Sequence, residues 1–273
     1  MARSPLLVLG ATSLIGRFAI PRLRQAGRPF VGVSRRGEAW LQADLTTAEG
    51  RARLPEAQTV LSLSPIWLLP EAIADLKARG MRRLVAFSST SVLTKAASTD
   101  ASERAVAAAL ARGEEAVRAS GVDWTLLRPT MIYAEGLDGN VSRLASLAQR
   151  LPVLPIAGRG DGRRQPVHAD DLAQGALQAL EAPAAIGRTY ELAGGETLTY
   201  REMCARVFGG LGRPPRILSL PAPFWRLGLT LASPLLPGAT GEMGARMERD
   251  LVFDDSAARA DFGWSPRQFR PSF

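Results

Sequence analysis

Residues 6–16 read Leu-Leu-Val-Leu-Gly-Ala-Thr-Ser-Leu-Ile-Gly, a short apolar run followed by a loop with a glycine at each end. Four consecutive apolar residues before a glycine indicate a strand that is buried on both faces. The next stretch, 14–26, has the pattern of a helix that ends at Gly27. Such a loop suits a phosphate group, because backbone N–H groups and the helix N-terminus converge on it. Gly10 permits the tight turn, and Gly16 permits close packing of helix on strand.

Strands and helices continue to alternate after this loop. Further strands are predicted at 30–33, 40–43, 59–63, 84–87 and 124–127, with helices at 70–79 and 101–120. Six short strands with helices between them predict an α/β fold with a doubly wound parallel sheet and helices on both faces.

The alternation weakens after Tyr133. Helices are predicted at 141–150, 170–181, 200–208 and 242–250, between turns that are rich in glycine and proline. We expect this half to complete the sheet and to add a smaller, mostly helical lobe over its carboxyl edge. The expected division is residues 1–135 and about 164–195 for the sheet domain, and about 136–163 and 196–273 for the lobe.

Composition narrows the functional classes. The 273 residues are 46% hydrophobic and 22% charged, as in ordinary globular proteins. The single cysteine, Cys204, excludes an intramolecular disulfide and a cysteine-based metal cluster. The single histidine, His168, excludes a site that needs two imidazoles, and no metal site is expected. The formal net charge is +8, but basic residues form no run longer than a pair, so no nucleic-acid binding is expected. No secretory signal is recognisable, and the protein is expected to be cytoplasmic.

One later segment is unusually apolar. Its large side chains are Phe224, Trp225, Leu227, Leu229, Leu231, Leu235 and Leu236. Arg226 and Pro234 interrupt the segment, which is shorter than the roughly 20 residues that a transmembrane helix needs. Three fates stay open: burial in the core or in a substrate pocket, contact with a protein partner, and contact with a membrane surface.

The end of the second strand predicts which cofactor binds. Proteins that bind NAD place an Asp or Glu there to hold the ribose hydroxyls. This chain has Ser34, Arg35 and Arg36 instead. Because a guanidinium pairs with phosphate through a planar set of donors, NADP is favoured over NAD. The alternative is an exposed arginine pair on a loop.

Several motifs in the order of the chain resemble those of extended or atypical short-chain dehydrogenase/reductases of the NAD-dependent epimerase/dehydratase group. These are Gly10–Gly16, with Ser13 in place of the middle glycine, Ala43-Asp44-Leu45, Val60–Ser64, Val85–Thr90, Trp124–Pro129 and Arg164–Ala173. The resemblance covers residues 5–195 and implies a Rossmann fold. It implies these cofactor-binding residues: Gly10, Thr12, Ser13, Leu14, Ile15, Gly16, Ser34, Arg35, Arg36, Asp44, Leu45, Leu63, Ser64 and Ser88.

The resemblance also implies a catalytic residue, Thr90, whose hydroxyl would polarise a substrate carbonyl. Alternatively, residues 88–91 only cap the end of the strand. The Tyr-x-x-x-Lys pair that normally moves the proton in this family is absent, because Ile73 and Ser91 stand four residues before the two lysines. Lys95 could replace the missing cation, or it could be an ordinary surface lysine.

The substrate side departs further from the family. Arg164 matches the position at which nucleotide-sugar epimerases hold a substrate phosphate, and Met131 stands where they have an asparagine. The resemblance thus makes Arg164 and Met131 candidate substrate-binding residues and favours an apolar or acidic substrate as much as a nucleotide sugar. His168 is expected to support the backbone at the start of a helix.

The sequence and its resemblance to the family leave two functions open. The first is an NADP-dependent oxidoreductase that transfers hydride to or from a small organic substrate between the sheet edge and the lobe. The second is a protein that holds NADPH without turnover, as an accessory or redox-sensing protein. The oligomeric state stays open, a homodimer included.

Overall fold

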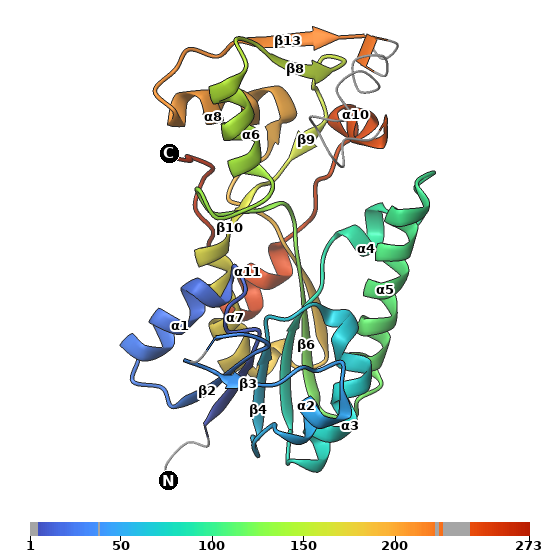
Figure 1. The fold of residues 1–273 in the computed structure, drawn as a ribbon, viewed down its shortest axis with the longest axis vertical. Coiled ribbons are helices and arrows are strands. Elements are labelled where there is room, and N and C mark those ends of the chain that lie inside the picture. Colours follow the sequence, from blue (N-terminus) through green and yellow to red (C-terminus); the bar gives the residue numbers. More distant parts are fainter. Residues whose placement is uncertain (1–4, 38, 222–223, 226–240) are drawn as a thin grey trace.

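The computed structural model describes residues 5–37, 39–221, 224–225 and 241–273. Its main feature is a seven-stranded sheet, ordered β11-β6-β5-β4-β1-β2-β3, in which all neighbouring strands are parallel (Figure 1). In chain order the strands are β1 Leu6–Leu9, β2 Phe30–Ser34, β3 Leu41–Gln42, β4 Thr59–Ser62, β5 Arg83–Phe87, β6 Asp123–Pro129 and β11 Arg188–Leu192. The predicted doubly wound parallel sheet is confirmed.

The strand order reverses beside β1. The chain first builds outward to β3 and then returns to β4 on the other side of β1. Leu9 at the carboxyl end of β1 pairs in register with Val33 of β2 and with Ser62 of β4. The loops that leave these three strands therefore start side by side, which is where open α/β sheets form their ligand crevice.

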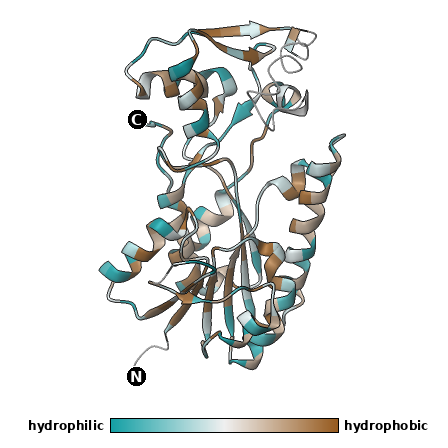
Figure 2. Cartoon of the chain, in the orientation of Figure 1, coloured by the Kyte–Doolittle hydropathy of each residue, from teal (hydrophilic) through white to brown (hydrophobic). Residues whose placement is uncertain are grey.

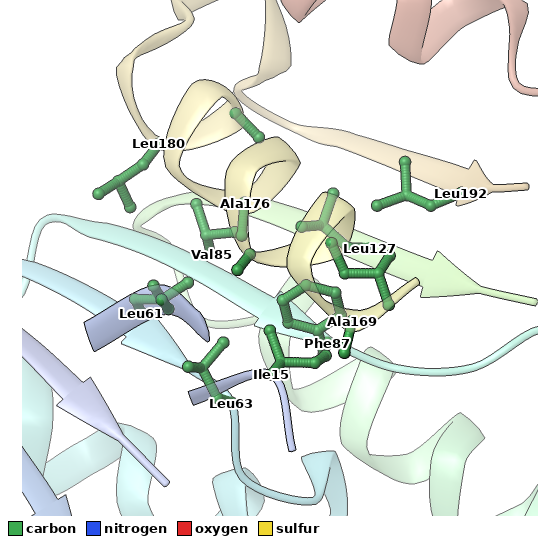
Figure 3. Packing of buried hydrophobic residues seen from close by; sticks show 14 of the residues in the cluster. Ile15, Leu61, Leu63, Val85, Phe87, Leu127, Ala169, Ala176, Leu180 and Leu192 are labelled. Atoms are coloured by element: carbon green, nitrogen blue, oxygen red, sulfur yellow. The ribbon is translucent and has the colours of Figure 1, made fainter. Parts of the chain in front are cut away.

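Helices cover both faces of the sheet because the strands are apolar on both sides. Leu6 and Val8 of β1 face one core cluster, while Leu7 and Leu9 face the other. The first cluster lies under α1 (Gly16–Gln25), α7 (Ala169–Glu181) and α11 (Ser256–Phe262). Figure 3 shows Ala169, Ala176 and Leu180 of α7 packed over sheet residues such as Val85 and Leu127.

The opposite cluster lies under two helices, α3 (Leu69–Ala78) and α5 (Ala101–Arg118), and the short α2 (Ala48–Ala52) contacts α3. Figure 2 shows the strands of the sheet largely in brown, the colour of hydrophobic residues. Gly113 lets α5 approach the chain after β4, since a Cβ there would lie 2.7 Å from the Ile66 carbonyl oxygen. This contact fixes the segment that follows β4, which becomes important at the ligand crevice.

The C-terminal part forms a smaller lobe above the carboxyl edge of the sheet (Figure 1). Its helices are α6 (Val141–Arg150), α8 (Tyr200–Gly210) and α10 (Gly241–Glu248). Its strands pair as β8 (Leu154–Ala157) with β13 (Ile217–Leu220) and as β9 (Arg163–Arg164) with β12 (Leu198–Thr199). A third two-stranded pair, β7 (Ile132–Tyr133) with β10 (Val167–His168), lies where the lobe meets the sheet. Tyr133, Phe208 and Phe269 are the largest side chains of a third core cluster that holds these elements together.

The chain does not divide as simply as the sequence suggested. α11 and Trp264 fall in the range expected for the lobe, yet they pack with α7 and β11 in the first cluster of the sheet. Of the apolar segment at 224–236, only Phe224 and Trp225 lie within the described residues. Phe224 is exposed, whereas Trp225 packs against the third cluster. Among the described residues, no helix combines the length and apolar character needed to cross a membrane.

Candidate cofactor site

A pocket of about 490 Å³ lies at the carboxyl ends of β1, β2 and β4. Its lining comes from the loop after β1, the end of β2, the chain after β3 and the chain after β4. These residues are Gly10, Thr12, Ser13, Val33, Ser34, Arg35, Arg36, Ala43, Leu45, Leu63, Ser64, Pro65, Trp67 and Leu68. The volume is in the range of small-molecule sites. The pocket stands at the reversal of strand order, where a Rossmann sheet binds its dinucleotide.

The two glycines of the loop are required by geometry. Gly10 has a φ of +79°, and a Cβ there would lie 2.8 Å from both the backbone N and the Oγ of Ser64. A Cβ at Gly16 would lie 2.5 Å from the carbonyl oxygen of Ala11. The loop can therefore lie against β4, and α1 against the loop, only because both positions lack a side chain.

The same loop presents free hydrogen-bond donors. Within the described part of the chain, the backbone N–H groups of Thr12, Leu14 and Ile15 have no acceptor. The side chains of Leu14 and Ile15 pack in the first core cluster, so these two residues offer the loop only their backbone. The first turn of α1 contains no acidic residue. Free N–H groups at a helix start without a competing carboxylate form a cradle that fits a pyrophosphate.

The side chain of Ser13 forms a hydrogen bond inside this loop. Its Oγ accepts a hydrogen bond from the backbone N–H of Gly16 at 3.1 Å, so it caps the start of α1. The hydroxyl hydrogen stays available to a phosphate oxygen. A serine in place of the family's middle glycine is therefore compatible with the geometry of the loop.

The end of β2 forms the cationic wall of the pocket. Ser34 is buried, and its Oγ lies 2.9 Å from the Oγ1 of Thr12, which ties β2 to the loop. The side chains of Arg35 and Arg36 are exposed at the rim of the pocket. Neither guanidinium pairs with a carboxylate among the residues that the structure describes. The wall thus offers two guanidinium groups outside any described ion pair, and the charge of Arg35 also helps to lower the pKa of Asp44.

The chain after β3 contributes one predicted residue to the pocket and turns the other away. Leu45 is buried and lines the pocket. The carboxylate of Asp44 instead accepts hydrogen bonds from the backbone N–H and the hydroxyl of Thr46, at 2.9 Å and 2.8 Å. These two bonds lower the pKa of Asp44 below its ordinary value. Asp44 therefore holds the turn before α2, and a contact with a cofactor stays a prediction.

Polar residues after β5 are bound by the protein itself. The Oγ of Ser88 donates to the Oε1 of Glu114 at 2.7 Å, and Arg128 and Arg118 donate to the same carboxylate. Burial alone would raise the pKa of Glu114, but hydrogen bonds from Arg128, Ser88 and Arg118 outweigh it and lower the pKa. Ser88 thus anchors α5 to the sheet, and its expected contact with a cofactor stays a prediction.

Thr90, the predicted catalytic residue, is also engaged. It is 8% exposed, and its Oγ1 donates to the Pro129 carbonyl oxygen at 3.2 Å. To donate to a substrate oxygen, this hydroxyl would have to leave that carbonyl. Thr90 adjoins α4 (Ser91–Thr94), a short helix that the sequence did not predict.

Lys95 ends α4 and points to the lobe. Its Nζ lies 3.5 Å from the Oε1 of Glu103 at the start of α5, and Arg246 of α10 pairs with the same carboxylate. Burial, and then the charge of Arg246, lower the pKa of Lys95. These three side chains form an ionic bridge between α5 and the lobe. Lys95 is thus a partly buried lysine in an ion-pair cluster, and a role as the missing catalytic cation stays a prediction.

Of the two predicted substrate residues, Arg164 lies on β9 of the lobe, and Met131 directly precedes β7, where the lobe meets the sheet. Arg164 is 3% exposed, and its guanidinium donates to the carbonyl oxygens of Arg163, Arg246 and Arg249. It thus holds the end of α10 in this structure. Met131 is partly buried against the third core cluster. Roles in substrate binding stay predictions for both.

His168 has the supporting role that the sequence predicted. Its Nδ1 accepts a hydrogen bond from the backbone N–H of Asp170 at 3.0 Å, so the side chain caps the start of α7. Its Nε2 lies 3.1 Å from the Oε2 of Glu135. With Nδ1 as the acceptor, Nε2 carries the hydrogen and donates it to this carboxylate.

Sequence reasoning missed five residues of the pocket: Val33, Ala43, Pro65, Trp67 and Leu68. A usable signal existed for the last three, since they directly follow Val60–Ser64, one of the motifs that resemble the family. Apolar residues after a strand, however, are more often core than ligand wall. Trp67 lies at the rim of the pocket because its neighbour Ile66 packs against α5, and the sequence does not reveal this contact.

A family model described as NAD(P)H-binding matches residues 43–183, which is just over half of the chain. The chain belongs to this NAD(P)H-binding family. It is an NAD(P)-binding Rossmann protein of the extended short-chain dehydrogenase/reductase and epimerase/dehydratase group, as the motifs indicated.

Individual relatives of this family member differ in what they do. The chain is 30% identical over 234 residues to (4-alkanoyl-5-oxo-2,5-dihydrofuran-3-yl)methyl phosphate reductase of Streptomyces griseus, covering 79% of this chain and 77% of the reductase. It is 32% identical over 98 residues to the mitochondrial NADH dehydrogenase (ubiquinone) 1 alpha subcomplex subunit 9 of Dictyostelium discoideum, covering 36% of this chain and 27% of that subunit. The chain spans less than half the length of this subunit and of an uncharacterized relative from Sinorhizobium fredii.

The fold is similar to that of a solved structure of MoeE5 in complex with UDP-glucose and NAD. The TM-score is 0.74 with 19% sequence identity, and the match covers 97% of this chain and 94% of MoeE5. At this identity the similarity concerns the fold.

Proposed function

We propose that this protein is an NADP-dependent oxidoreductase that acts on a small organic substrate between the sheet edge and the lobe. The observation that carries the choice of cofactor is the pair of exposed guanidinium groups, Arg35 and Arg36, in the wall of the pocket. A ribose 2′-phosphate brings negative charge to this wall, and guanidinium groups bind it with charge-assisted hydrogen bonds. Ser34 adds a hydroxyl beside them.

The remaining cofactor contacts follow from the loop. The N–H groups of Thr12, Leu14 and Ile15 would hold the pyrophosphate, and Leu45, Leu63 and Ser64 would contact the adenosine. Bound NADPH would supply the hydride for reduction of a carbonyl to an alcohol, and a proton must reach the carbonyl oxygen from another group. The reductase relative from Streptomyces griseus supports this reaction class.

A second function, NADPH binding without turnover, is favoured by the region around β5. α5 contains neither tyrosine nor lysine, and the hydroxyls of Ser88 and Thr90 are both hydrogen-bonded to the protein. The match to a subunit of NADH dehydrogenase, a multisubunit enzyme, supports an accessory role of this kind.

Calorimetric titration tests the choice of cofactor. We expect NADPH to bind at least several-fold more tightly than NADH. Arg35→Glu should weaken NADPH binding by about tenfold and change NADH binding little, because it removes a charge-assisted contact to the 2′-phosphate. The control is Arg82→Glu, which makes the same charge change at an exposed position far from the pocket. Equal affinity of the wild type for both cofactors would contradict the proposal.

A turnover assay separates the two functions. The wild type is mixed with NADPH and fractions of a metabolite pool, and loss of the dihydronicotinamide absorbance is followed. Oxidation of NADPH that depends on one fraction supports the oxidoreductase. Tight binding of NADPH without oxidation by any fraction favours the accessory role.

A further inference from the structure

Trp67 is a large aromatic side chain that core packing does not explain. It lies in a 3₁₀ turn, η1 (Ile66–Leu68), directly after β4, and 47% of its surface is exposed. Its two neighbours in this turn, Ile66 and Leu68, face the core or pack against it. Trp67 instead lines the pocket together with Pro65 and Leu68. An exposed indole in a pocket wall points to a ligand surface.

The backbone under Trp67 is held on both sides. Ile66 is 1% exposed and sits against Gly113 of α5, where there is no room for a side chain. Leu69, which begins α3, is fully buried. The N–H of Leu68 donates to the Pro65 carbonyl oxygen at 3.1 Å, which closes the turn. The indole is therefore presented at a fixed place on the rim, with only its own side-chain torsions free.

The pocket shows which half of a dinucleotide Trp67 would meet. Its described lining contains Trp67 together with Arg35, Arg36 and Leu45. Ser88, Thr90 and Met131 are not among the described lining residues. The first group surrounds the expected adenosine half, while the second stands at the expected reaction centre. The adenine is thus the part of the cofactor that comes within reach of the indole.

We infer that Trp67 stacks on the adenine ring of the bound cofactor and positions the adenosine half. The inference rests on the proposed placement of the adenosine in this pocket. A purine offers a flat π-face, and an aromatic side chain in contact with it excludes water from both surfaces. Leu45, Leu68 and Ala43 supply the apolar remainder of the wall. Stacking does not involve the 2′-phosphate, so it should serve NADPH and NADH equally.

Three variants test this role: Trp67→Ala, Trp67→Phe and the control Trp124→Phe. Trp124 is partly buried on β6, outside the described lining of the pocket, and its loss corrects for removal of one indole. Affinities for NADPH, NADH and adenosine 2′,5′-bisphosphate are measured by calorimetry, and tryptophan fluorescence is recorded in parallel. The bisphosphate carries the adenosine half without the nicotinamide, so a quench by it reports on this half alone.

We expect Trp67→Ala to weaken all three ligands by a similar factor, about tenfold. Trp67→Phe should keep most of the affinity and lose the fluorescence quench that adenosine 2′,5′-bisphosphate causes in the wild type and in Trp124→Phe. The thermal midpoint of Trp67→Ala should stay near that of the wild type, because half of the side chain is exposed.

Unchanged affinity of Trp67→Ala, or a quench that persists in Trp67→Phe, would overturn the inference. These outcomes are separate from a failure of the proposed function. Loss of NADP preference would show in the ratio of NADPH to NADH affinity and in Arg35→Glu, and neither depends on Trp67.

Discussion

The crevice at the sheet edge has two sides that treat their polar groups in opposite ways. On the β1–β2 side, three backbone N–H groups have no acceptor and two guanidinium groups form no ion pair among the described residues. On the β5–β6 side, the hydroxyls of Ser88 and Thr90 are hydrogen-bonded, and the buried carboxylate of Glu114 has three donors. Polar groups without a partner in the protein are free to bind a ligand, whereas buried groups that are hydrogen-bonded stabilise the fold. The β1–β2 side is therefore built to bind, and the β5–β6 side to support.

The largest expected effect is on the β1–β2 side. Gly16→Val should abolish NADPH binding in calorimetry, because its Cβ would meet the Ala11 carbonyl oxygen and push α1 from the loop. Gly139→Val is the control, since nothing lies within 4 Å of a Cβ there. Ser13→Gly should be nearly neutral, because only the cap on Gly16 is lost. If Gly16→Val, or the smaller Gly16→Ala, folds and binds NADPH like the wild type, this loop does not hold the pyrophosphate.

A large effect on stability is expected on the β5–β6 side. Glu114→Ala should lower the free energy of unfolding by about 3 kcal/mol, because it leaves buried donors of Arg128 and Ser88 without their acceptor. Glu115→Ala, the exposed neighbour, should change it by less than about 0.5 kcal/mol. Chemical denaturation measures both. Equal values for the two variants would contradict a supporting role of this side.

Acid should weaken the same contact. The pKa of Glu114 in the folded protein lies below its ordinary value of 4.5, so its ionised form stabilises the fold above that pH. The difference in free energy of unfolding between wild type and Glu114→Gln should be full above pH 4.5 and shrink as the pH falls through the lowered pKa. A difference independent of pH would show that this carboxylate is not ionised in the folded state.

The smallest effect sharpens the contrast between the two sides. Ser88→Ala should cost about 1 kcal/mol of stability through the lost bond to Glu114. If the bond to Glu114 is the whole role of Ser88, calorimetry should find the affinity for NADPH unchanged. A weaker affinity with unchanged stability would instead mean that Ser88 contacts the cofactor, as the sequence predicted, and that its bond to Glu114 is exchanged on binding.

The sequence predicted what short-range patterns determine. The helix expected at 141–150 is α6, Val141–Arg150, and the strand expected at 6–9 is β1, because apolar periodicity and glycine placement fix such elements locally. The two-residue strands of the lobe, such as β9, exist only through their partners and had no signal of their own. The sequence also did not predict where individual side chains point. The guanidinium of Arg164 donates to carbonyl oxygens at the end of α10, and these acceptors lie more than eighty residues further along the chain.

The position of Trp264 has a consequence for the order in which the protein forms during synthesis. Its ring sits where a Cβ at Gly175 would be, and its Nε1 donates to the Ala193 carbonyl oxygen at 3.1 Å. It thereby completes the core cluster that contains β1, the strand of this sheet that is synthesised first. β11 joins the sheet beside β6 only after the first elements of the lobe have been made. Until α11 and Trp264 are synthesised, one apolar face of the nascent sheet therefore stays partly uncovered. We expect ribosome-bound chains that stop before residue 256 to be sensitive to protease and prone to aggregation.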